Sequence, residues 1–299
     1  MICLRTIIIF TMLVCIFFFH SVKGEASDNG KDHPPLYFSL VPKKNVDQQI
    51  SELTPLLKLL EKKMDRQVVT IYPHSYQSVI EGLLSQTIDF AILGPAAYAK
   101  ARNRDGQIEA FAAFARKKGY VTPRGSFYHS VLFTCKEHGV DAISALQGRR
   151  VALTDPASTS GSVIPHVAFS GHIQDSLSSF FGTLIYTGSH DRSIRSVVNK
   201  DVDAAFVSSA RIDEAIEKKI LSPDQVVILW RSDPIHSDPF VFSSGVDRAV
   251  KDQIRQIILS AASQLSDMLN KMQMVDIVPV GDADYRAVHE IVNRQDGKK

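Results

Sequence analysis

Hydrophobic positions follow two alternating patterns from residue 36 onward, one typical of strands and the other of helices. Leu36–Val41 is a short apolar run, as expected for a buried strand. Across 46–64 the apolar residues recur at spacings of three and four, which predicts an amphipathic helix. Further strands are expected at 68–72 and 89–93, with a helix capped by Ser75 between them. This order predicts parallel βαβ units.

The same alternation resumes after about residue 125 and predicts a second α/β half. Strands are expected at 128–134, 149–153, 183–186, 204–207 and 226–229, and helices at 161–172, 191–199 and 213–219. A strand at 240–242 and a long helix over 246–270 then return the chain to the first half.

Two crossings between the halves, near 118–128 and 232–240, follow from this order. We therefore expect an α/β protein of two lobes, with a ligand cleft between them. One lobe is expected to consist of 36–122 with 240–299, and the other of 123–239.

The N-terminus is a separate feature. Arg5 precedes the apolar run Ile7–Phe19, and Val22-Lys23-Gly24 has the residues of a cleavage site after Gly24. This pattern predicts a secretory signal peptide over 1–24. An uncleaved membrane anchor is the alternative, but it needs about 20 apolar residues. Lipoprotein cleavage at Cys15 is a weaker alternative because Val14 precedes that cysteine. The polar segment 25–35 is expected to be disordered.

Charge and cysteine content narrow the class of protein. The chain has 34 basic and 32 acidic residues, and both basic residues of the leader, Arg5 and Lys23, would leave with it. The remaining balance is neutral, so a nucleic-acid-binding surface is not expected. Cys135 is the one cysteine beyond the leader, so no internal disulfide can form. An exported protein of this kind fits a bacterial periplasm.

The stretch LTDPASTSGS, residues 153–162, is the main candidate for chemistry. It lies between a predicted strand and a predicted helix, where unpaired N–H groups and the helix dipole favour an anion. Ser158, Thr159 and Ser160 add three hydroxyl donors, and Pro165 falls where a missing N–H costs little. Simple N-capping is the alternative, since Ser and Thr are common capping residues. Three consecutive hydroxyls before Gly161 favour an oxyanion site.

Other candidates also follow predicted strands. His190, within Gly188-Ser189-His190-Asp191, could donate to an oxyanion, or it could lie at the surface beside a capping residue. In the other half, Tyr76 and Tyr98 follow strands, although each could instead be a core residue.

These motifs together resemble the substrate-binding proteins of phosphonate, phosphite and phosphate ABC transporters. The resemblance covers about residues 36–270. It rests on Tyr76-Gln-Ser-Val-Ile-Glu-Gly-Leu, Asp89-Phe-Ala-Ile-Leu-Gly-Pro95 with Tyr98, Asp155-Pro-Ala-Ser-Thr-Ser-Gly161 with Pro165, Gly188-Ser-His-Asp191 and Val202-Asp-Ala-Ala-Phe206.

The resemblance implies a type 2 periplasmic binding protein, whose two lobes close on a ligand that is passed to a membrane permease. It implies that the phosphorus oxyanion is held by Ser158, Thr159, Ser160 and His190. It also implies that tyrosines cover the ligand, which indicates Tyr76, Tyr98 and, near the hinge, Tyr128.

Relatives that hold an aminoalkyl group place an acidic residue shortly after the Val-Asp-Ala-Ala segment. Here Ser208-Ser209-Ala210 stands there, while Asp238 could be a second acidic site. A carboxylate beside an oxyanion requires a proton or an ammonium between them. We therefore expect phosphite, phosphate or a small alkylphosphonate in preference to aminoethylphosphonate.

Two other function classes share some of these features. Ser158, His190 and Asp191 are nominally a hydrolase set, but no nucleophile elbow, zinc-protease motif or P-loop is present in the sequence. We therefore expect no catalysis, no cofactor and no metal. A sensor of the same fold that signals to a membrane histidine kinase is the second alternative.

Overall fold

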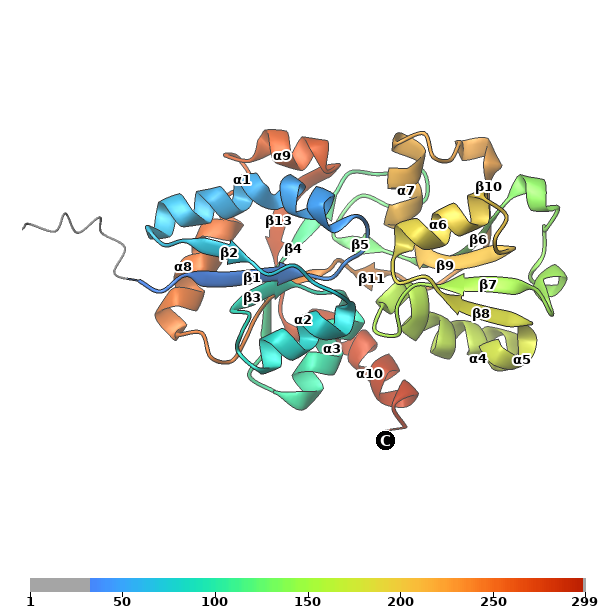
Figure 1. Cartoon of the computed structure of the whole chain (residues 1–299), viewed down its shortest axis with the longest axis horizontal. Helices are drawn as coiled ribbons and strands as arrows, with labels where there is room; N and C mark the ends of the chain where they lie inside the picture. The colour runs from blue at the N-terminus through green and yellow to red at the C-terminus, as the bar shows by residue number, and fades with distance from the viewer. Residues whose placement is uncertain (1–32, 298–299) are drawn as a thin grey trace, which may run out of the picture. The chain divides into compact units, whose positions relative to one another are not determined.

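The computed structural model describes residues 33–297, in which the main strands form two separate sheets (Figure 1). The predicted signal peptide and most of the predicted disordered start lie outside these residues. No helix among residues 33–297 combines the length and the hydrophobicity needed to cross a bilayer.

The first sheet has six strands in the order β13-β4-β12-β3-β1-β2. They are β1 (Leu36–Leu40), β2 (Val68–Thr70), β3 (Phe90–Ile92), β4 (Glu109–Arg116), β12 (Pro239–Phe242) and β13 (Met274–Pro279). β1 pairs in parallel with both β2 and β3, as the βαβ pattern predicts. β12 and β13 return antiparallel from the distant C-terminal part of the chain.

Helices cover both faces of this sheet because successive side chains along its strands point alternately into two apolar clusters. Phe90 and Ile92 face one cluster, whereas Ala91 and Leu93 face the other. The first face is covered by α1 (Val46–Met64), α8 (Arg248–Leu259) and α9 (Ser266–Lys271), and the second by α2 (Tyr76–Leu84) and α3 (Pro95–Arg104). We call this sheet and its helices the first lobe.

The second sheet has five strands in the order β10-β6-β9-β7-β8. They are β6 (Ser130–Cys135), β7 (Arg150–Leu153), β8 (Thr183–Tyr186), β9 (Ala204–Ser208) and β10 (Val226–Arg231). Its helices are α4 (Ser170–Ile173), α5 (Leu177–Phe180), α6 (His190–Val198) and α7 (Ser209–Glu217). The turns η3 (Thr159–Val163) and η4 (Pro165–Phe169) are π-helical and lead into α4. We call this sheet and its helices the second lobe.

The crossing segments pair with each other. β5 (Phe127–Tyr128) and β11 (Ile235–His236) form a two-stranded antiparallel ribbon between the lobes. The last helix, α10 (Arg286–Gln295), packs on α3 of the first lobe and on η3 and η4 of the second. Short 3-10 turns occur at η1 (Lys136–His138), η2 (Ile143–Leu146), η5 (Pro223–Gln225) and η6 (Asp282–Tyr285).

The predicted long helix over 246–270 is wrong. α8 ends at Leu259, and α9 begins at Ser266. The Ser260 hydroxyl donates to the carbonyls of Gln256 and Ile257 at this end, a bond that competes with helix continuation. The apolar spacing runs through the break because both helices pack on the same cluster.

α7 begins four residues earlier than predicted, directly after β9, and it ends at Glu217. This earlier start places Arg211 on the same helix as Glu214. The pattern of apolar residues assigned no elements to α3, β4, β13 and α10. The β4 segment is rich in alanine, so the period of two is weak there although the strand is buried.

Candidate ligand-binding site

A cavity of about 310 Å³ lies between the two lobes. Its walls come from the carboxyl ends of strands: Lys43 and Lys44 follow β1, Gly94 follows β3, and Ser158 follows β7. His190 begins α6 after β8. Open α/β sheets bind ligands at this edge, because strand ends and helix starts leave polar groups unpaired there. Seven of the eight predicted site residues line the cavity: Tyr76, Tyr128, Ser158, Thr159, Ser160, His190 and Asp238.

The three consecutive hydroxyl residues are all buried at the start of η3. Ser158 Oγ accepts a hydrogen bond of 3.2 Å from the Gly161 N–H, so the capping alternative holds for this residue. Thr159 Oγ1 accepts a bond of 2.9 Å from the Ala96 N–H of α3, whose N-cap, Gly94, has no side chain. Each hydroxyl accepts in these bonds and retains its own proton for donation.

Gly161 is required by close packing. A Cβ built there would lie 2.0 Å from Thr154 Oγ1 and 3.0 Å from Ser158 Oγ. A side chain at this position would therefore displace Thr154 and the hydroxyl of Ser158, which lines the cavity.

His190 is 3% exposed, and its neighbours set its tautomer. The Ser208 N–H donates to His190 Nδ1 at 3.3 Å, so this nitrogen is the acceptor. Nε2 must then carry the proton, 3.4 Å from Ser158 Oγ. Burial, and then the positive charges of Arg211 and Lys43, lower the pKa of His190 from 6.5 to about 3. A neutral imidazole therefore presents one N–H donor beside the serine.

Burial of neutral His190 predicts a pH-dependent stability. The pKa of His190 is lower in the folded protein than in the unfolded chain. The contribution of His190 to the free energy of unfolding is therefore complete above the unfolded-state pKa, and it is lost as the pH falls towards the folded-state pKa. We expect the free energy of unfolding to decrease by about 2 kcal/mol between about pH 7 and about pH 5 from this group alone. Urea denaturation at both pH values tests this. A His190→Asn variant should show a smaller decrease, and an equal decrease would contradict the assignment.

Tyr76 lines the cavity from the start of α2. Its side chain is 1% exposed, and its hydroxyl has no hydrogen-bond partner within residues 33–297. Burial, followed by the charges of Asp238 and Asp155, raises the pKa of Tyr76 well above its ordinary value. An unpaired buried hydroxyl is costly, and this hydroxyl is available to donate to an acceptor in the cavity.

The two other tyrosines differ. Tyr128, on β5 in the crossing ribbon, is buried and lines the cavity. Tyr98 does not line the cavity, contrary to expectation. Its hydroxyl donates to Asp282 at 2.8 Å, and its ring packs edge-on against Tyr285 at 5.4 Å. The physical reason is that Tyr98 lies on the face of α3 that packs against the C-terminal segment. Tyr98 is therefore a core residue, which was the alternative interpretation of this tyrosine.

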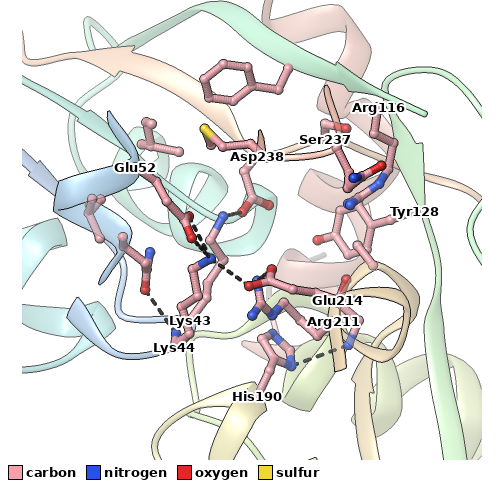
Figure 2. Close-up of a pocket in the computed structure, with 18 of the residues that line it drawn as sticks. Lys43, Lys44, Glu52, Arg116, Tyr128, His190, Arg211, Glu214, Ser237 and Asp238 are labelled. Carbon is pink, nitrogen blue, oxygen red and sulfur yellow. Dashed lines mark hydrogen bonds and ion pairs between the residues drawn. The ribbon is translucent and has the colours of Figure 1, made fainter. Parts of the chain in front are cut away.

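Asp238 lines the cavity, but the protein itself supplies its counter-ion. Lys43 Nζ lies 2.6 Å from Asp238 Oδ2. A dashed line marks this ion pair in Figure 2. The expected need for a proton or a ligand ammonium beside Asp238 is therefore met by Lys43. This carboxylate gives no information about which ligand binds.

A charged cluster that sequence reasoning missed forms another wall of the cavity (Figure 2). Lys44 Nζ lies 2.6 Å from Glu52 of α1 and 2.7 Å from Glu214 of α7, so this lysine joins the two lobes. Arg211 also bonds Glu214, and it bonds Asp191 at 2.9 Å. The available signal was the pair Lys43-Lys44 directly after a buried strand. The carboxylates of this cluster all pair with lysine or arginine side chains of the protein, so Glu214 is not free to pair with a ligand ammonium.

Residues 33–297 contain no group of three His, Cys, Asp or Glu side chains arranged to hold a metal ion. What the cavity does contain is a buried set of neutral donors with cations nearby, an arrangement suited to binding a small anion.

The protein-family model described as "ABC transporter, phosphonate, periplasmic substrate-binding protein" matches residues 38–285 of the chain. The chain belongs to this family. Members of the family are components of transport systems and not enzymes.

Two curated relatives are similar to this member of the family. The phosphate-import protein PhnD of Mycolicibacterium smegmatis is 26% identical over 270 residues, which cover 84% of this chain and 83% of the relative. The phosphonates-binding periplasmic protein of Escherichia coli is 26% identical over 231 residues, which cover 75% of this chain and 65% of the relative.

Solved structures show the same two-lobed fold. A binding protein component of an ABC phosphonate transporter from Pseudomonas aeruginosa superposes with a TM-score of 0.78 at 21% identity, over 89% of this chain and 88% of that one. PhnD1 from Prochlorococcus marinus, solved in complex with methylphosphonate, has a TM-score of 0.73 at 18% identity, over 88% of this chain and 98% of that one.

Proposed function

We propose that this protein captures a small phosphorus oxyanion in the cavity between its lobes and delivers it to the permease of an ABC transporter. Family membership supports the transport role, and the unpaired Tyr76 hydroxyl beside the Ser158–Ser160 donors is the observation that carries the choice of ligand. The names of both curated relatives refer to import or periplasmic binding, which favours a transporter component over the kinase-linked sensor.

The proposed ligand contacts come from both lobes. Ser158, Thr159, Ser160 and the Nε2–H of His190 donate from the second lobe, and Tyr76 donates from the first. Neutral donors suit a dianion, because several converge on one group and each charge-assisted hydrogen bond is stronger than a neutral one. A ligand that contacts both lobes binds more tightly when the lobes are closed, so ligand binding stabilises the closed state. We further propose that the chain divides into its two lobes at the crossings near 118–128 and 232–240.

The proposed location is the periplasm, reached through cleavage of the leader after Gly24. The family description supports the compartment. Mass spectrometry of the mature protein tests the cleavage site, and a mature chain that still carries its apolar N-terminal run would contradict it.

Tyr76→Phe tests the ligand site. Because the Tyr76 hydroxyl has no protein partner within residues 33–297, its removal should leave the free energy of unfolding unchanged or slightly higher. Binding of methylphosphonate and phosphate should weaken by about tenfold, since a hydrogen bond to a charged group is lost. Calorimetry and thermal unfolding of the same preparations give both quantities. Unchanged affinity would exclude Tyr76 from the site.

A further inference from the structure

The cavity contains nitrogen donors that no protein group uses. Arg211 is 9% exposed, and its two terminal nitrogens bond Asp191 and Glu214. Its third nitrogen, Nε, is buried without a partner. Arg116, at the end of β4, also lines the cavity and forms no ion pair with any residue of 33–297. Figure 2 shows Arg116 without a dashed contact.

All but one of the acidic residues that line the cavity are, by contrast, already engaged. Asp238 is held by Lys43, and Glu52 by Lys44. Glu214 accepts from Lys44, Arg211 and Lys218. Glu217 is exposed and, among the described residues, unpaired. The buried part of the cavity therefore has unused donors and engaged acceptors, which favours a second anionic group over an ammonium.

The cavity is also larger than a phosphorus oxyanion requires. Its volume of about 310 Å³ corresponds to the share of about ten water molecules in the liquid, whereas phosphate has only five heavy atoms. Leu40, Leu53, Ile92 and Phe114 are buried and line it. Apolar side chains of this kind suit a short carbon linker between two polar groups.

We propose that the ligand is a phosphonate or phosphate ester whose organic substituent carries a second anionic group, held by Arg116 and by the free Nε of Arg211. This inference rests on the proposed function, because the Ser158–Ser160 donors must hold the phosphorus group at the other end.

Three phosphonates of similar size test the inference by calorimetry at neutral pH. Carboxyethylphosphonate carries a carboxylate, propylphosphonate is apolar, and aminoethylphosphonate carries an ammonium. Carboxyethylphosphonate should bind about tenfold more tightly than propylphosphonate, because charge-assisted hydrogen bonds form only with the carboxylate. Aminoethylphosphonate should bind most weakly of the three. Equal affinities, or tightest binding of the aminoethyl compound, would overturn the second anionic subsite.

An Arg116→Met variant should reduce the preference for carboxyethylphosphonate over propylphosphonate to about threefold or less, while the affinity for propylphosphonate changes by less than about twofold. Arg248→Met, on the exposed side of α8, is the matched control and should preserve the preference. An equal loss for all three ligands would assign Arg116 to the phosphorus group and overturn the inference.

Thermal unfolding verifies that Arg116→Met is folded, and Arg116→Gln replaces it if it is not. A failure of this inference is distinguishable from a failure of the proposed function. If methylphosphonate and phosphate bind but the carboxylate gives no preference, only the second subsite is rejected. If the natural protein binds none of these phosphorus compounds, the proposed function itself is rejected.

Discussion

Replacing Glu214 with glutamine is expected to lower the free energy of unfolding by about 3 kcal/mol, because three cations lose their common carboxylate. Lys44, Arg211 and Lys218 all bond Glu214, whose side chain is 20% exposed. Burial alone would raise the pKa of Glu214, but Arg211 and Lys44 outweigh it and hold that pKa below its ordinary value. Urea denaturation at neutral pH measures the loss.

Glu81→Gln is the matched control for this prediction. Glu81 also pairs with an arginine, Arg104, but both side chains are about half exposed. Exposed ion pairs contribute little to stability, so the denaturation midpoint of Glu81→Gln should hardly change. Equal effects of the two substitutions would contradict a structural role for the cluster.

The stabilisation by Glu214 should also depend on pH. Because folding lowers the pKa of Glu214, this stabilisation is present above the ordinary carboxylate pKa and is lost as the pH falls towards the folded-state pKa.

The double variant Ser158→Ala, Ser160→Ala is expected to weaken binding of methylphosphonate and phosphate by at least about a hundredfold. Each hydrogen bond to a charged group contributes about 1.5 to 3 kcal/mol, and two such donors are removed. Loss of the Ser158 cap should lower the free energy of unfolding by about 1 kcal/mol, which leaves the protein folded. Calorimetry measures the affinities.

Ser162→Ala controls for a change in the same turn. Ser162 is buried in η3, but it is not among the residues that line the cavity, and its hydroxyl contacts Tyr186. Its replacement should leave both affinities within about twofold. Full affinity in the double variant would show that the phosphorus group lies elsewhere in the protein.

Some failures of sequence reasoning have an identifiable physical reason. Tyr98 follows a strand end just as Tyr76 does, but the two side chains lie in different surroundings. Tyr98 packs against the C-terminal segment, which is distant in the sequence, whereas Tyr76 faces the cavity. The break between α8 and α9 is hidden in the sequence because the apolar spacing continues across it, since both helices pack on one cluster.

The local order of residues by itself determined the strands and helices of the βαβ units and the donor-rich stretch at Ser158–Ser160. These features arise from apolar periodicity and from the unpaired groups at a helix start, and both are properties of consecutive residues. The tertiary structure alone decided which charges meet in the cavity. Lys43 meets Asp238, and Lys44 meets Glu214, across separations of 195 and 170 residues. Which ion pairs with which depends on how the two lobes come together, and no local pattern contains that information.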